Sequence, residues 1–273
     1  MEIKKKILSV LFILFLWQMV FAQDSILHLQ LTKTIAGTYA NFYIDRMGNI
    51  FLLNPSNQIK KINEEYDSIA IYNDVKQYGD VYSIDASNPL KIIVYYKDFT
   101  TVVVLDRLLN VLNVIDLRKQ NILQSKAVAL SYDNNIWIYD EWDNKLKKMD
   151  DYGNLLSETA DFRMLFDDIH PPSIIIDCSR QLYLYDEKSG WIIFDYYGAL
   201  KHQYPFIGWK DVQVQNATLS GRDSNYIYFS RPAEFYFSKV RPDINISSAI
   251  KILFQNNIYY VLRKTGLEIY KAM

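Results

Sequence analysis

A pattern that recurs about every 44 residues constrains the fold of this chain more than any other feature. Four segments share an apolar run, an Asn or Asp, a short turn and a second apolar run. The Asn or Asp stands at positions 63, 106, 150 and 195, in steps of 43, 44 and 45. Asn, Asp and Gly tolerate the backbone angles of tight turns, so each segment predicts two strands joined by such a turn.

A second pattern, a polar turn followed by an apolar pair, runs in phase with the first. Together they predict four short strands per unit, in the third unit about 127–132, 136–139, 145–149 and 155–159. A lone sheet of this size leaves apolar faces in water, and stacking copies in a closed ring removes that exposure. A period of this length with four strands per unit is typical of β-propeller blades. The apolar pairs are Ile50-Phe51, Ile92-Ile93, Ile136-Trp137, Leu182-Tyr183, Ile227-Tyr228 and Ile258-Tyr259.

The two ends of the chain predict how the ring closes. The sixth unit supplies only three strands, about 249–254, 258–262 and 267–270. The segment Ile26–Thr32 alternates apolar and polar residues, as a strand exposed on one side does. We therefore predict an all-β, six-bladed β-propeller of four-stranded antiparallel blades, closed by this N-terminal strand. The alternative, a five-bladed ring with an extra hairpin, leaves the terminal apolar strands unused.

Three motifs carry a family resemblance. The hairpin Asp-x-x-Gly-Asn-Ile-Phe at 45–51 and the Asp-x-Tyr-Gly turns at 150–153 and 195–198 resemble those of six-bladed propellers of the NHL-repeat kind, in particular exported bacterial ones. The resemblance covers residues 25–272. Two units depart from it: the second has Asn88-Pro89 at a turn, and the fifth has a weak fourth strand around 244–247.

The N-terminus predicts export. Lys4, Lys5 and Lys6 precede the apolar stretch Ile7–Trp17, and Val20-Phe21-Ala22 fits a cleavage site. We expect residues 1–22 to be a signal peptide, with an uncleaved anchor helix as the alternative, and residues 23–273 to form one propeller domain. The mature protein is then periplasmic, extracellular or associated with the cell envelope, with no membrane-spanning segment. Its single cysteine, Cys178, allows no internal disulfide.

Composition and motifs favour binding over catalysis. With 30 basic and 31 acidic residues the chain lacks the excess positive charge of nucleic-acid binders. It carries no nucleophile elbow, phosphate-binding glycine loop or H-E-x-x-H motif, so no catalytic residue and no cofactor is predicted. The acidic clusters at 140–143 and 167–170 lack calcium-loop spacing and are typical of solvated turns, so no metal is predicted. The expected innermost strands, which carry no ring of Asp, Glu and His, are 41–43, 81–83, 128–130, 173–175, 217–219 and 250–252.

Propeller geometry places the candidate binding residues on one face. Loops between blades share a face with the loops that join strands two and three; these include 207–215 and Arg231-Pro232. Exposed aromatic side chains bury a large area at small entropic cost, which favours a protein, peptide or glycan partner in an envelope assembly. The alternatives are that each aromatic residue packs between blades, or that the protein is a metal-dependent hydrolase or lyase with its site at the channel mouth. The predicted site comprises Tyr78, Phe99, Trp142, Trp209 and His170.

Overall fold

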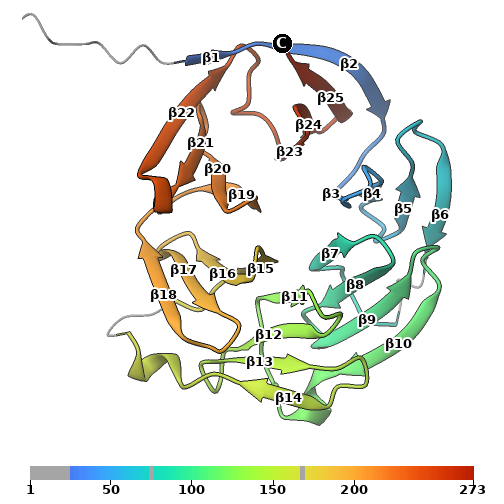
Figure 1. Ribbon diagram of the computed structural model, residues 1–273. Helices are drawn as coiled ribbons and strands as arrows, with labels where there is room; N and C mark the ends of the chain where they lie inside the picture. The colour runs from blue at the N-terminus through green and yellow to red at the C-terminus, as the bar shows by residue number, and fades with distance from the viewer. Residues whose placement is uncertain (1–24, 74–76, 167–169) are drawn as a thin grey trace, which may run out of the picture.

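Six antiparallel sheets stand around a central axis in the computed structural model, which describes residues 25–273 except 74–76 and 167–169 (Figure 1). The predicted signal peptide, residues 1–22, lies outside this part of the chain. Each sheet is one blade with its first strand nearest the axis, as the recurring pattern predicted. The six-bladed, all-β prediction is confirmed.

The strands follow one another around the ring, and three short 3-10 helices lie in the connections among the residues that the structure describes. Blade one consists of β3 (Asn41–Ile44), β4 (Ile50–Leu53), β5 (Ile59–Ile62) and β6 (Ser68–Tyr72). Blade two consists of β7 (Ser83–Asn88), β8 (Lys91–Tyr96), β9 (Thr101–Asp106) and β10 (Val111–Asp116), followed by η1 (Leu117–Gln120). Blade three consists of β11 (Val128–Leu130), β12 (Ile136–Asp140), β13 (Lys145–Met149) and β14 (Leu155–Glu158), followed by η2 (Phe162–Met164).

The second half of the ring contains both chain ends. Blade four consists of β15 (Ile174–Cys178), β16 (Gln181–Asp186), β17 (Gly190–Asp195) and β18 (Leu200–Tyr204). Blade five consists of β19 (Lys210–Gln215), β20 (Thr218–Arg222), β21 (Ile227–Arg231), η3 (Pro232–Glu234) and β22 (Tyr236–Pro242), with β1 (Ser25–Leu27) added outside β22. Blade six consists of β23 (Lys251–Gln255), β24 (Ile258–Arg263), β25 (Gly266–Ala272) and β2 (Leu29–Ala36).

The ring closes where the sequence predicted, but with shifted bounds. β2 pairs antiparallel with β25 from Leu29 opposite Ala272 to Ala36 opposite Gly266, and so completes blade six. The residues before it cross to the neighbouring blade, where β1 pairs parallel with β22. Asp243 fixes the crossing, because its carboxylate accepts from the backbone N–H of Leu29 (3.0 Å) and contacts His28 Nδ1 (3.1 Å). The N-terminal segment therefore joins blades five and six.

In the fifth unit each predicted strand is shifted by one: the strand predicted to be first is the second strand of the blade. Its first strand is β19, a segment predicted to be an inter-blade loop, and the predicted inner strand 217–219 belongs mostly to β20. The turn between them is Asn216-Ala217, with φ angles of 48° and 59°. Turns with positive φ usually contain a glycine, and this one does not. Ile227 therefore opens the third strand. The expected fourth strand at 244–247 is part of the connection to blade six.

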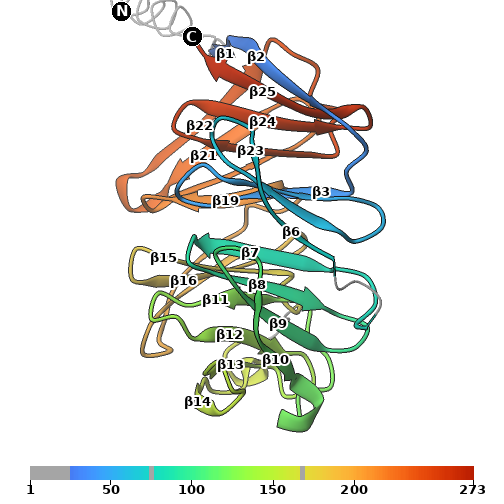
Figure 2. The same ribbon diagram turned by 90° about the vertical axis from the view of Figure 1, so that its right-hand side faces the viewer.

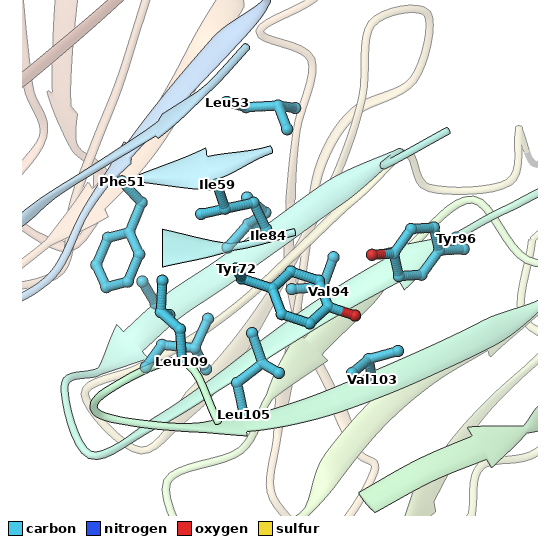
Figure 3. Close-up of a cluster of buried hydrophobic side chains, with 12 residues drawn as sticks. Phe51, Leu53, Ile59, Tyr72, Ile84, Val94, Tyr96, Val103, Leu105 and Leu109 are labelled. Atoms are coloured by element: carbon cyan, nitrogen blue, oxygen red, sulfur yellow. The ribbon is translucent and has the colours of Figure 1, made fainter. Parts of the chain in front are cut away.

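Apolar side chains between adjacent sheets form the core. Between blades one and two, for example, Phe51, Ile59, Val94 and Leu105 are fully buried together (Figure 3). The same arrangement recurs around the ring in six clusters of buried side chains. Each blade thus covers one apolar face of the next, which is why the sheets need the ring to bury their surfaces.

Antiparallel strand order sends the connections to two different faces, and Figure 2 shows the ring from the side. The connections from strand one to two and from three to four share one face, here called the turn face. Those from two to three and from blade to blade share the other, the loop face. Because blade five is out of phase, Arg231 and Pro232 open a connection on the turn face, not on the loop face as predicted.

Most strand three-to-four turns repeat one hydrogen-bond pattern. In the second blade, Asp106 Oδ1 accepts from the backbone N–H of Leu108 (2.7 Å) and Asn110 (2.8 Å). Asp150 and Asp195 accept from the residues two and four places on in the same way. The third residue after each has positive φ: 63° at Leu109, and 84° and 82° at the glycines of the other two turns. These local bonds are the physical basis of the recurring sequence pattern.

Candidate functional site

The loop face is where the predicted binding residues were expected to gather, and the structure separates them into two groups. Connections between blades insert apolar side chains between the sheets: Leu117 and Ile122 after blade two and Phe162 after blade three are completely buried. Trp209, after blade four, is 7% exposed and stacks on Phe206 (ring centroids 4.9 Å apart) and Tyr228 (5.4 Å). The expectation that Trp209 is exposed was wrong, because a long inter-blade side chain finds apolar cover between two sheets.

Tyr78 belongs to the same group as Trp209. It is half-buried in the connection between blades one and two, and its ring lies 5.4 Å from that of the buried Tyr96. His170 is half-buried between blades three and four. The structure shows no hydrogen bond, ion pair or ring contact between these two described residues and Trp142. Asp167 and Asp168, predicted neighbours of His170, lie outside the described residues.

Phe99 and Trp142 are exposed, and they lie on neighbouring blades. Both are in connections between strands two and three, which lie at the tips of the sheets and have no second sheet to cover them. Trp142 is 72% exposed and Phe99 44% exposed, and Leu123 (57%) and Tyr82 (41%) lie on adjoining loops of the same face. We call Tyr82, Phe99, Leu123 and Trp142 the blade 2–3 patch.

A buried ion pair lies beneath Trp142. Asp140 is completely buried, and its Oδ1 accepts from the backbone N–H of Trp142 (2.9 Å). Lys147 Nζ donates to Asp140 Oδ2 (2.6 Å) and to Asp143 Oδ2 (2.5 Å). Burial alone would lower the pKa of Lys147, but its bonds to the two carboxylates outweigh burial and raise it. The exposed indole therefore lies on a loop whose backbone is held in place by a buried ion pair.

Hydrogen bonds also join the loops that carry the patch. Gln124 O accepts from the backbone N–H of Glu141 (3.1 Å), and Gln124 Nε2 donates to Glu141 Oε2 (3.1 Å). Thr100, next to Phe99, donates from Oγ1 to the carbonyl of Leu123 (3.4 Å). A surface ordered in this way loses little conformational entropy when a partner binds.

Charged side chains surround the patch. Lys97 Nζ lies 5.0 Å from the centre of the Tyr82 ring, and Lys126 Nζ lies 3.7 Å from Glu141 Oε2. The edge of the patch therefore offers two lysine side chains around an apolar centre, while the Glu141 carboxylate is mostly buried. A polar rim around an apolar centre is the usual arrangement of a protein-binding surface.

The central channel contains a cavity of about 530 Å³ lined by the innermost strands of all six blades. Its walls are more polar than the predicted inner strands, because the inner strands of blades two and five are β7 and β19. These strands bring Asp85, Asp211 and Gln213 to the channel, and Asp177 of β15 also lines it. The 31-residue step from Ile227 to Ile258, short beside the other steps between apolar pairs, is the sequence signal that blade five was out of phase.

The channel carboxylates and amides connect neighbouring blades. Asp85 accepts from the backbone N–H of Leu130 (2.7 Å), and Asp211 accepts from that of Ile252 (2.8 Å). Gln213 both accepts from the N–H of Phe254 (3.1 Å) and donates to its carbonyl (3.3 Å). Burial raises the pKa of Asp85 despite its hydrogen bonds with Ser87 and Leu130. Such bonds satisfy the inner strand edges, whose backbone groups otherwise lack partners.

The acidic residues offer little to a metal ion. Asp140 and Asp143 are bound to Lys147, and Glu141 is paired with Lys126 and Gln124. In the described part of the chain, no three His, Cys, Asp or Glu side chains come together as a possible metal site. Among the same residues, no helix is long and apolar enough to span a membrane.

Comparison with known proteins identifies the fold. The chain matches no protein-family model and no curated protein sequence. Among solved structures it is similar to a catalytically inactive virginiamycin B lyase from Staphylococcus aureus solved with quinupristin, at 12% identity and a TM-score of 0.61, over 90% of this chain and 99% of the lyase. It is also similar to the Pan2 WD40 domain of Neurospora crassa, at 9% identity and a TM-score of 0.60, over 89% and 95% of the two chains.

A third similar structure is the extracellular domain of a putative hybrid two-component system from B. thetaiotaomicron. It is 14% identical with a TM-score of 0.58, over 89% of this chain and 34% of that one. The names of these three proteins indicate different functions, and their sequence identity to this chain is 14% or less. The similarity therefore establishes the β-propeller fold.

Proposed function

We propose that this protein is an exported, non-enzymatic propeller that binds a protein, peptide or glycan of the cell envelope through the blade 2–3 patch. The observation that carries the proposal is Trp142, an indole 72% exposed on a loop whose base is a buried ion pair. Exposing so large an apolar ring and burying a charged pair both cost free energy, and a partner that covers the ring recovers part of that cost.

Phe99 and Leu123 extend the surface that a partner would contact. Exposed aromatic side chains are enriched among the residues that contribute most to binding. The predicted members Tyr78 and His170 are proposed to support the neighbouring loops and not to contact the partner directly. Trp209 is not part of this proposal, because it is covered on both ring faces.

Export is proposed from the N-terminal sequence, Lys4–Lys6 followed by an apolar stretch and a cleavage site. The similarity to an extracellular domain is consistent with that location. We also propose that the blades are of the NHL-repeat kind, on the strength of the hairpin at 45–51 and the two Asp-x-Tyr-Gly turns.

Co-purification from the native cell envelope tests the binding proposal. The variant Phe99→Ala/Trp142→Ala is compared with Tyr152→Ala/Tyr197→Ala, which removes two aromatic rings that are highly exposed on the turn face. We expect the first variant to lose partners that the wild type and the second variant both retain. Equal recovery of every partner by all three proteins would remove the blade 2–3 patch from the binding site.

A second candidate is a metal-dependent hydrolase or lyase acting at the channel mouth. It is favoured by the open cavity together with the similarity to the virginiamycin B lyase. Metal analysis of the purified mature protein separates the two proposals. A stoichiometric divalent metal would favour the lyase-like function, and its absence after purification without chelators would favour the binding module.

A further inference from the structure

Lys251 presents an ammonium group to the central channel. It is the first residue of β23, and it lines the cavity beside β3 of the neighbouring blade. Its Nζ donates to Asn41 Oδ1 (2.9 Å) and to the carbonyl of Phe42 (2.9 Å), and lies 4.0 Å from the centre of the Tyr43 ring. An ammonium group has three N–H donors, so these two neutral acceptors leave one N–H for another partner.

The charge of Lys251 has no carboxylate partner. No Asp or Glu oxygen of a described residue lies within 4.0 Å of its Nζ. Asp211 faces it, but that carboxylate accepts from Arg222 Nε (2.6 Å) and from the backbone N–H of Ile252. The other channel carboxylates, Asp85 and Asp177, bind donors of blade three. Lys251 is half-buried, and a charge partly removed from water without a counter-ion is costly, so an anion that enters the channel would offset this cost.

The cavity walls near the inner strands offer apolar surface for the remainder of such a ligand. Half-buried Ile174 and Ile176 of β15 and Leu253 of β23 line the same space as Lys251. One unpaired cation beside apolar walls matches a ligand with one negative charge and an apolar body. The other lysine that lines the cavity, Lys126, is paired with Glu141 (3.7 Å). Multiply charged anions, such as nucleotides, would need more unpaired cations than these lining residues provide.

We propose that the channel is a binding site for a small organic monocarboxylate, whose carboxylate accepts from Lys251 Nζ and whose apolar body lies against Ile174, Ile176 and Leu253. This site is independent of the proposed partner-binding function, since it lies in the channel and not on the blade 2–3 patch. The Asn41 side chain and the Tyr43 ring position the ammonium group for the ligand.

Calorimetric titration with octanoate tests the proposal, with 1-octanol as the uncharged ligand of equal chain length. We expect octanoate to bind one per chain and 1-octanol to bind on the order of tenfold more weakly, the loss expected for a charge-assisted hydrogen bond. Lys251→Met should weaken octanoate to the level of 1-octanol. The control Lys119→Met, which removes an exposed lysine of η1, should bind octanoate like the wild type.

The pH dependence of binding provides a second test that does not require Lys251→Met to fold. Burial lowers the pKa of Lys251 to about 8, partly offset by Asp211, so the ammonium form is lost as the pH rises above that value. Octanoate affinity should therefore fall above about pH 8 in the wild type and stay constant to about pH 9.5 in Lys251→Arg, whose guanidinium remains charged. Asp211 of β19 and Tyr43 of β3 face Lys251, and Arg222 of β20 binds Asp211. Burial raises the pKa of Tyr43 to about 12, well above this range.

Any one of three results would overturn the monocarboxylate site. Unchanged octanoate affinity in Lys251→Met, or a flat wild-type pH profile, would show that Lys251 only links blades six and one. The third result is failure of both octanoate and benzoate to bind the wild type at millimolar concentration. Neither result affects the co-purification test of the blade 2–3 patch, so the two proposals can fail separately.

Discussion

On the turn face, each repeated connection is held by hydrogen bonds within five residues, whereas on the loop face the inter-blade connections are held by side chains buried between sheets. Asp106 illustrates the first arrangement and Phe162 the second. Local bonds require the same residue at the same place in each turn. Burial requires only an apolar group of suitable size, so the remaining residues of the loop face are free to vary and to bind other molecules.

Removing an inter-blade side chain should have the largest effect on stability. Phe162→Ala is expected to lower the free energy of unfolding by about 3–5 kcal/mol, because the ring is fully buried against Tyr139 and Phe194. Met164→Ala, in the same 3-10 helix but 82% exposed, should change it by less than about 0.5 kcal/mol. Urea unfolding measures both. Equal losses would show that burial does not hold this loop.

Glycine substitutions test the backbone of the turn face. Gly153 has a φ of 84°, and an added Cβ would lie 3.0 Å from Ile115 Cγ2. Gly198 has a φ of 82°, but its nearest neighbour, Thr159 Cγ2, would lie 3.6 Å away. Gly153→Ala should therefore cost about 1–2 kcal/mol and Gly198→Ala about 1 kcal/mol or less, measured by thermal unfolding. The reverse order would contradict the steric argument.

Removing a turn carboxylate should lower the free energy of unfolding by less than the Gly153→Ala substitution does. Asp106→Ala removes two bonds to backbone N–H groups and one to the Asn110 side chain, with an expected loss of about 1 kcal/mol. Asp106→Asn keeps an acceptor oxygen and should lose less. Urea unfolding at neutral pH measures both, and an alanine variant as stable as the wild type would show that these bonds do not stabilise the turn.

Low pH should remove the same stabilising contribution of the turn carboxylates, because it protonates them. The Asn110 side chain holds the pKa of Asp106 below its usual value, and the backbone N–H of Ala199 does so for Asp195. Their contribution is therefore complete above the unfolded pKa of about 4 and is lost as the pH falls through the lower folded value. Asp106→Asn should show a smaller loss of stability between about pH 5 and pH 2 than the wild type. Identical pH profiles would contradict this.

The smallest effect on stability is expected at the blade 2–3 patch. Trp142→Ala should change the free energy of unfolding by no more than about 0.5 kcal/mol, because most of the indole is in solvent. A loss of several kcal/mol would show that the ring is structural, and would place Trp142 with Phe162 and not with a binding surface.

The same difference between the faces explains what the sequence could predict. The turns at Asp106, Asp150 and Asp195 form by local bonds, so their spacing revealed the blades. The closure of the ring was predicted from the alternating segment Ile26–Thr32 and the three strands of the last unit. Blade five was misplaced because Asn216-Ala217 forms a tight turn without glycine. The channel residues Asp85 and Asp211 were missed because the inner strand of blade two was predicted to end at residue 83 and residues 207–215 were predicted to form an inter-blade loop. In the structure, both carboxylates lie on inner strands and bind the edge of the next blade.

The candidate site was predicted only in part for a similar reason. Tyr78 and Trp209 could not be distinguished from Phe99 and Trp142 by residue type. The distinction comes from position: an aromatic residue between two blades can pack against both sheets, and one at the tip of a single sheet cannot. Knowledge of which loops lie between blades therefore decides which aromatic side chains are exposed.

Hydrogen–deuterium exchange of the protein with and without its co-purified partner tests the central claim most directly. We predict slower exchange in the bound protein at the connections 97–100, 121–126 and 141–144, which carry the blade 2–3 patch, and unchanged exchange at the turns 106–110, 150–154 and 195–199. Slower exchange at those three turns, with none at the connections around Trp142, would place the partner on the opposite face and contradict the account.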